Sequence, residues 1–129
     1  MIRINLYITH VSHLNIYRIK VLYDTNTLNS SKNYTNKVYD LDGSKSIYSD
    51  MVNIFQSLVS INSSIKVNII FKGFFEYNLP VAYAFWNSFD VVEMLYKREN
   101  HILTLYCKSE NIYLTIFNFD LQSFVNKIS

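Results

Sequence analysis

Two aspartates stand just before the first glycine of the chain, in the string VYDLDGSKS at residues 38–46. A strand that runs into Asp-x-Asp-Gly is found in metal-dependent phosphoryl-transfer sites, and oxygen ligands at alternate positions are typical of calcium loops. A calcium loop that opens at Asp40 needs glycine at its sixth position and glutamate at its twelfth, where this chain has Lys45 and Met51. The pattern therefore does not predict a calcium loop.

The string VYDLDGS also resembles the first motif of the haloacid dehalogenase-like phosphatases, in which one aspartate is the nucleophile and the other the acid/base group. The resemblance covers seven of the 129 residues. It implies a doubly wound parallel sheet, a later lysine and an acidic pair that holds magnesium, whereas the carboxylates after Gly43 are singletons. We therefore interpret Asp42-Gly43 as a turn and Ser44 or Ser46 as the cap of a following helix.

Three histidines and one cysteine are the remaining groups that could perform chemistry. His10, His13 and His101 would form a zinc site, or the acid and base of a small metal-independent nuclease, if their imidazoles converged. Cys107 falls on the apolar face of an expected strand, so we predict a core residue with an inert thiol. With only two glycines the chain has no glycine-rich phosphate loop. We predict no catalytic residues, no metal site and no cofactor, and we favour ordinary loop and strand roles for the histidines.

Aromatic residues make up 16% of the chain, and 11 of them are tyrosines. We expect the phenylalanines to lie in the core. Tyr and Trp also anchor protein interfaces, because each combines a large apolar surface with a polar group. The sequence therefore yields six candidate interface residues: Tyr7, Tyr77, Tyr83, Trp86, Tyr106 and Tyr113.

Composition and charge narrow the class of protein. Half of the residues are hydrophobic, which predicts one folded domain spanning 1–129. The net charge is +2 without any run of like charge, so we do not expect nucleic acid as the main partner. The first residues alternate apolar and polar, unlike a signal peptide, and the most apolar span, 67–86, is interrupted by charged residues and a proline. We therefore expect a soluble cytoplasmic protein that does not enter membranes.

Alternation and helical periodicity predict most of the elements. Two strands, from Ile2 and from about Ile16 to Tyr23, form an antiparallel pair joined through 10–15, and residues 24–37 are expected to be a mobile surface loop. A short strand at 37–41 precedes a helix that begins near Ser46 and ends near Ile61, and another strand ends at Gly73.

The C-terminal half contains one ambiguous segment. Residues 74–87 fit either a strand or a helix, and we prefer a strand at 81–86 followed by a helix at 88–98. Strands at 102–108 and 112–119 are expected to form a hairpin whose register pairs Lys108 with Asn111, and Asp120 to cap a closing helix. Both faces of this hairpin are apolar, so either other elements cover both of them or one face is exposed and binds a partner.

The expected order is β-β-β-α-β-β-α-β-β-α, typical of a single α+β domain with a largely antiparallel sheet and two to three helices. We hypothesise a non-enzymatic protein-binding domain, most concretely an immunity protein or antitoxin that neutralises a cognate toxin by steric occlusion. A phage or viral accessory protein that inhibits a host defence complex is the second hypothesis, and the histidine nuclease is the third. Abundant Asn, Ile, Lys and Tyr indicate an AT-rich gene, as in viruses and mobile elements. The expected partner is another protein, either a cognate toxin or a host factor. A homo-oligomer is also compatible with the sequence.

Overall fold

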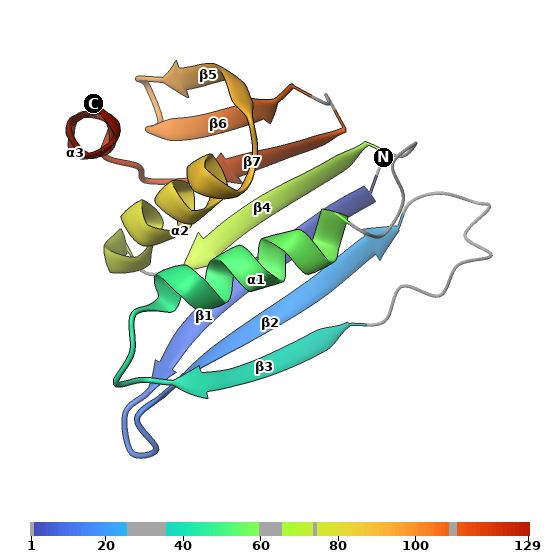
Figure 1. Cartoon of the computed structure of the whole chain (residues 1–129), viewed down its shortest axis with the longest axis vertical. Coiled ribbons are helices and arrows are strands. Elements are labelled where there is room, and N and C mark those ends of the chain that lie inside the picture. The colour runs from blue at the N-terminus through green and yellow to red at the C-terminus, as the bar shows by residue number, and fades with distance from the viewer. Residues whose placement is uncertain (1, 26–35, 60–65, 74, 109–110) are drawn as a thin grey trace.

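The computed structural model describes residues 2–25, 36–59, 66–73, 75–108 and 111–129. They form a single-domain α+β fold with a seven-stranded sheet and three helices (Figure 1), which confirms the predicted fold class. The elements are β1 (Ile2–Val11), β2 (Ile16–Thr25), β3 (Lys37–Asp42), α1 (Ile47–Val59), β4 (Val67–Gly73), α2 (Phe75–Ser88), β5 (Val91–Lys97), β6 (Ile102–Cys107), β7 (Ile112–Ile116) and α3 (Leu121–Ile128).

The sheet is mixed rather than largely antiparallel. Its strand order is β3-β2-β1-β4-β7-β6-β5. The outer pairs are antiparallel, whereas β4 runs parallel to both of its neighbours, β1 and β7. β3, α1 and β4 form a β-α-β unit in which β2 and β1 lie between the two strands, so the parallel neighbours of β4 are β1 and β7.

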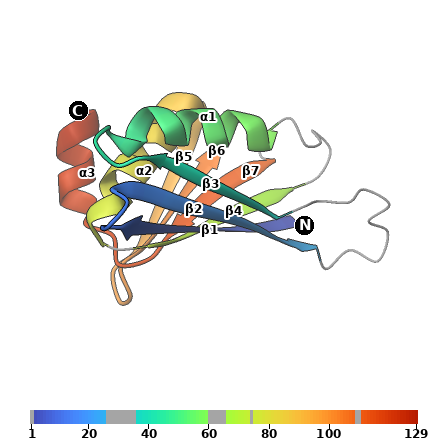
Figure 2. The same ribbon diagram turned by 90° about the horizontal axis from the view of Figure 1, so that it is seen from below.

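The helices that the structure describes cover one face of this sheet only. α1 and α2 pack side by side on the same face, and α3 lies beside α2 (Figures 1 and 2). The core between the layers is apolar and contains fully buried Phe55 of α1, Phe71 of β4 and Phe85 of α2. No helix within the described ranges is both long and apolar enough to span a bilayer.

Local sequence determines where α1 begins. Asp42 accepts hydrogen bonds from the backbone N–H (2.9 Å) and hydroxyl (2.7 Å) of Ser44, which closes the turn after β3. The Ser46 hydroxyl then accepts from the N–H of Tyr48 at 3.2 Å and caps the helix. The turn and cap read from DxDGSKS are therefore confirmed, and Met51 and Phe55 on the predicted stripe are buried.

Our preferred assignment of secondary structure is wrong in the segment 75–97. The predicted strand at 81–86 lies in helix α2, and the predicted helix at 88–98 is strand β5. Apolar residues surround α2 because it packs on the sheet, on α1 and on α3, so the helical period is weak there. The charges of Asp90, just before β5, and of Glu93 and Lys97 within it imitate a helix dipole pattern, but consecutive residues from Glu93 to Lys97 pair with β6.

The C-terminal elements agree with the prediction, except that β7 ends at Ile116 and not at the predicted residue 119. β6 and β7 pair in the predicted register, with Tyr106 opposite Tyr113 and Leu105 opposite Leu114. The Asp120 carboxylate accepts from the N–H of Ser123 and caps α3. The predicted turn at Ser109-Glu110 and most of the predicted mobile loop at 24–37 lie outside the described residues; the ends of that segment belong to β2 and β3.

Candidate functional site: the open face of the sheet

The sheet face opposite α1 and α2, here called the open face, is the candidate site (Figure 2). Strand side chains alternate between the two faces, so the registers show which residues share it. In the middle of the sheet these residues are Arg3, Asn5, Tyr7, Lys20, Leu22, Asn68, Ile70, Lys72, Thr104, Tyr106, Tyr113 and Thr115. Aromatic and aliphatic side chains are thus interspersed with polar and charged ones on a surface formed by all the central strands.

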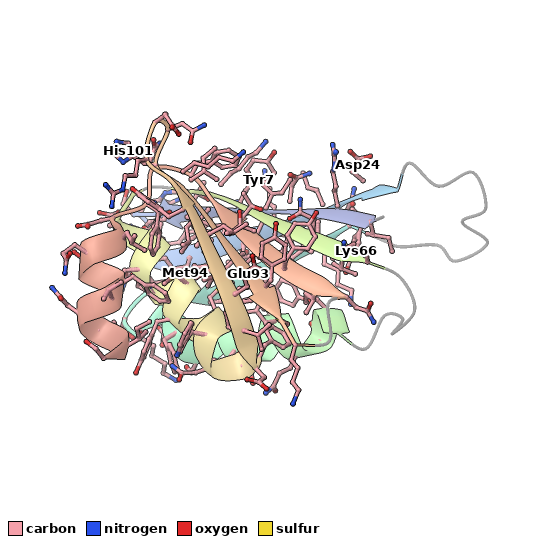
Figure 3. The ribbon with its side chains drawn as sticks, turned by 90° about the horizontal axis from the view of Figure 1, so that it is seen from above. Tyr7, Asp24, Lys66, Glu93, Met94 and His101 are labelled. Carbon is pink, nitrogen blue, oxygen red and sulfur yellow. The ribbon has the colours of Figure 1, made fainter. Side chains whose placement is uncertain are left out.

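Three of the predicted interface residues lie on the open face. Tyr106 and Tyr113 stack across β6 and β7 with ring centroids 5.2 Å apart and an interplanar angle of 23°. Tyr7, on β1, lies between Lys20 of β2 and Lys72 of β4, and the Lys72 ammonium is 5.9 Å from the centre of its ring. Figure 3 shows Tyr7 on the surface away from the helices. Partial burial, the largest cause, raises the pKa of Tyr113 above its ordinary value.

Charges of both signs occur on the open face. Arg3, Lys20 and Lys72 are its basic residues near the centre, whereas Asp24 and Glu93 lie toward opposite sides. On β2 and β3, Arg18 forms a bidentate ion pair with Asp40, with N–O distances of 2.8 and 3.1 Å. Hydrogen bonding to Arg18 lowers the pKa of Asp40. The Asp40 carboxylate therefore already has a partner, and this ion pair links β3 to β2.

The other three predicted interface residues lie on the helix side. Tyr77 is buried, 7% exposed, and packs edge-on against Tyr17. Tyr83 is half-buried beneath the ammonium of Lys127, which lies 4.7 Å from its ring centre. Trp86 is also half-buried and packs edge-on against Phe124 of α3. These residues join α2 to the rest of the fold and are not part of the open face.

The structure does not bring the three histidines together. His10 is the last residue but one of β1, and its Nε2 lies 3.3 Å from the side-chain oxygen of Asn15. His101 lies in the β5–β6 turn, and β4 and β7 lie between β1 and β6 in the sheet (Figure 1). Within the described residues, no group of three His, Cys, Asp or Glu side chains is arranged to hold a metal ion.

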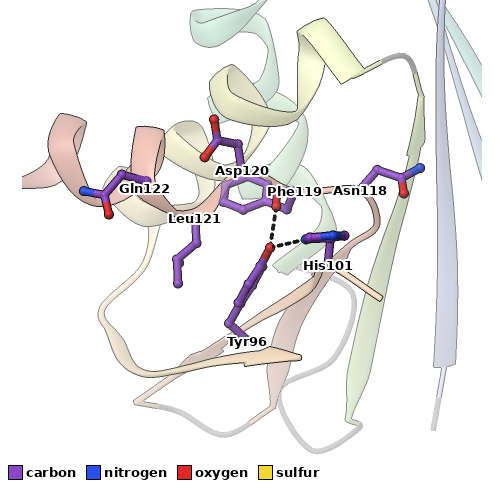
Figure 4. Close-up of a pocket in the computed structure, with 7 residues that line it drawn as sticks. All are labelled: Tyr96, His101, Asn118, Phe119, Asp120, Leu121 and Gln122. Carbon is purple, nitrogen blue, oxygen red and sulfur yellow. Dashed lines mark hydrogen bonds between the residues drawn. The ribbon is translucent and has the colours of Figure 1, made fainter. Parts of the chain in front are cut away.

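His101 instead lines a hollow of about 590 Å³ beside α3 (Figure 4). The Tyr96 hydroxyl donates to the carbonyl of Phe119 at 2.8 Å and therefore accepts from Nδ1 of His101, 2.9 Å away. The N–H of Phe119 donates in turn to the His101 carbonyl at 2.9 Å. These bonds fix the β5–β6 turn to the segment before α3, which explains why His101 tolerates a positive φ of 55°.

The remaining candidates have structural roles. Hydrogen bonds from Ser44 lower the pKa of Asp42, and the adjacent Gly43 donates its N–H to the Asn15 carbonyl at 2.8 Å. An added Cβ on Gly43 would lie 2.4 Å from that oxygen, so this close approach requires glycine. Cys107 is buried as predicted, and burial raises its thiol pKa to about 12.

Sequence reasoning missed part of the open face. Ile70 lies at its centre, and its alternation with buried Ile69 and Phe71 could have identified it. Leu95 of β5 was missed because that segment was assigned to a helix. A search of protein-family models, curated proteins and solved structures finds no match to this chain.

Proposed function

We propose that this chain is a protein-binding domain that contacts its partner through the open face of the sheet. The observation that carries the proposal is the one-sided cover: two helices pack on one face, while the other displays the Tyr106–Tyr113 stack and Tyr7. Tyrosines on a rigid sheet lose little conformational entropy on binding, because the strands already hold their backbone. They are therefore suited to be the anchors of an interface.

The mixture of charges favours a protein over a nucleic acid. A surface that binds phosphates through counterion release needs clustered cations. Here Lys20 and Lys72 flank Tyr7, but Asp24 and Glu93 occur on the same face. Aromatic anchors with charges of both signs beside them suit a protein interface, which combines buried aromatic residues with polar contacts.

The most concrete form of the proposal is an immunity protein or antitoxin of the cytoplasm. Such a protein needs no reacting groups, since it neutralises a toxin by covering its active site. The AT-rich composition supports an origin in a mobile element or virus and suits equally an inhibitor of a host defence complex. Growth of cells that express the captured partner, with and without this chain, distinguishes the two: only a toxin's growth arrest is relieved.

The test combines capture with two matched variants. The wild-type chain is used to capture its partner from the native host, and the dissociation constant is then measured with both proteins purified. The double variant Tyr106→Ala/Tyr113→Ala should weaken binding about thirtyfold or more, equivalent to about 2 kcal/mol for the loss of anchor residues. Tyr83→Ala removes a tyrosine from the helix side and should bind like the wild type.

Two results would contradict the proposal. One is a partner that depends on Tyr83 and not on the Tyr106–Tyr113 stack, which would place the interface on the helices. The other is tight binding of a fluorescently labelled single-stranded RNA that Tyr7→Ala abolishes, which would make the open face a nucleic-acid surface.

A further inference from the structure

We infer that the free edge of β5 binds the same edge of a second copy of this chain, in antiparallel orientation about a two-fold axis at Leu95. This homodimer goes beyond the proposed function, because it uses the edge strand β5 and leaves the central open face with Tyr7 accessible. The inference combines the exposure of β5, its local regularity and its charge sequence.

The exposed apolar surface is concentrated on this edge. β5 is the last strand of the sheet and pairs only with β6 among the described strands. Val92, Met94 and Leu95 are 61%, 36% and 48% exposed, and they make up three of the six exposed large hydrophobic residues found in the described part of the chain. An edge strand with unpaired backbone groups and apolar side chains is a template for another strand.

The usable part of the edge is short and regular. A β-bulge interrupts the pairing with β6 between Val91 and Glu93, and the register is then continuous from Glu93 to Lys97. Figure 3, which views the molecule from the β5 side, shows Glu93 and Met94 on opposite sides of this strand, with no helix in front of it. Five consecutive residues, Glu93-Met94-Leu95-Tyr96-Lys97, are therefore available to pair in one register.

This segment is self-complementary when it is read in the antiparallel direction. With the two-fold axis at Leu95, Glu93 of each copy lies opposite Lys97 of the other, and the two Leu95 side chains lie opposite each other between these ion pairs. All of these residues belong to the open face of their strand. Opposite charges directly across a strand pair are stabilising, and like charges are destabilising.

Other arrangements lack this match. Moving the axis to Met94 places Glu93 opposite Leu95, and moving it to Glu93 places the two carboxylates opposite each other. The other sheet edge, β3, carries Val38, Asp40 and Asp42 on its open face and Lys37, Tyr39 and Leu41 on its helix face. Neither face of β3 contains both charge signs, so no register of β3 with itself forms an opposite-charge pair.

The predicted dimer has a definite shape and strength. A two-fold axis perpendicular to the sheet keeps the helices of both copies on one side, so the two open faces form one continuous surface. Because a five-residue strand pair buries less surface than a stable dimer needs, we expect reversible, concentration-dependent association.

The test is charge exchange followed by analytical ultracentrifugation over a wide range of protein concentration. The 15.3 kDa wild-type chain should shift from monomer to dimer as the concentration rises. In a dimer of Glu93→Lys, two lysine–lysine pairs replace the two ion pairs, and in a dimer of Lys97→Glu two glutamate–glutamate pairs replace them. Each variant should therefore dimerise about tenfold or more weakly than the wild type. An equimolar mixture of these two variants restores both ion pairs and should form a heterodimer of wild-type strength.

Lys66→Glu is the matched control, since Lys66 is exposed and lies away from β5 (Figure 3), and it should dimerise like the wild type. Circular dichroism checks that every variant remains folded. A wild-type chain that stays monomeric at all concentrations overturns the inference, as does a dimer that both charge reversals leave intact. Neither result bears on partner binding by the open face, which is measured separately with the Tyr106→Ala/Tyr113→Ala variant.

Discussion

Asp120 caps α3 with both oxygens of its carboxylate. One oxygen accepts from the N–H of Ser123 at 3.3 Å and the other from the Ser123 hydroxyl at 2.6 Å. These bonds stabilise the charged form, and the side-chain bond from Ser123 is the largest cause that lowers the pKa of Asp120 from 3.8. A residue that sequence reasoning treats as a helix signal thus also makes the stability of the fold depend on pH.

We predict that Asp120→Asn is less stable than the wild type at neutral pH and that this difference disappears in acid. Asparagine can still cap the helix, but it lacks the charge. Because the folded pKa lies below 3.8, the carboxylate contributes its full stability above 3.8 and loses it as the pH falls through the lower, folded value. Urea unfolding at a series of pH values measures the difference. Glu99→Gln, in the exposed β5–β6 turn, controls for the loss of one negative charge, and a difference that is constant with pH would refute the prediction.

Asn78 joins α2 to the segment between β7 and α3. It is buried, and its amide donates to the carbonyls of Phe117 and Asn118 at 3.1 Å each. Asn118 has a positive φ of 53°, so the chain turns sharply where these two carbonyls meet the helix. One side chain therefore positions both the start of α2 and the exit from the sheet.

We predict that Asn78→Ala lowers the free energy of unfolding by about 2 kcal/mol, because two partly buried hydrogen bonds from its amide are lost. Asn87→Ala is the matched control: Asn87 is exposed on the same helix and donates to the carbonyl of Tyr83. Its effect should stay within about 0.5 kcal/mol. Urea denaturation of the three proteins tests this, and equal losses for both variants would mean that the carbonyls find other donors.

Elements with one clearly buried face were predictable, whereas α2, which buries most of its surface, and β5, which buries little, were not. β1 and α1 show clear periods of two and 3.6, since each has one apolar side. α2 contacts the sheet and two helices, so Val81, Tyr83 and Phe85 imitate a strand. Neither face of the exposed edge strand β5 is fully buried. Its strand conformation depends on pairing with β6, which the local periodicity of the sequence does not reveal.

The candidate site depends on the order of the strands in the sheet, which local sequence patterns do not specify. Alternation predicted that Tyr7, Tyr106 and Tyr113 point outward, but these residues share one surface only because β4 and β7 join the two halves of the sheet in parallel. The position of the helices could not be read from the sequence either. The same outward tyrosines would be buried if α3 crossed the open face instead of lying beside α2.

This architecture predicts a graded pattern of amide hydrogen exchange. β1, β4 and β7 are paired on both sides beneath the helices, so their amides should exchange most slowly, whereas those of β3 and β5, at the two edges, should exchange fastest. If β5 pairs with a second copy, its protection rises with protein concentration while that of β3 stays constant. Exchange measured by mass spectrometry at low and high concentration gives both readings, and the Glu93→Lys variant should lose the concentration dependence. Protection that rises at β3 instead would place the contact between copies at the opposite edge, and fast exchange in β4 would contradict the central position of its strand.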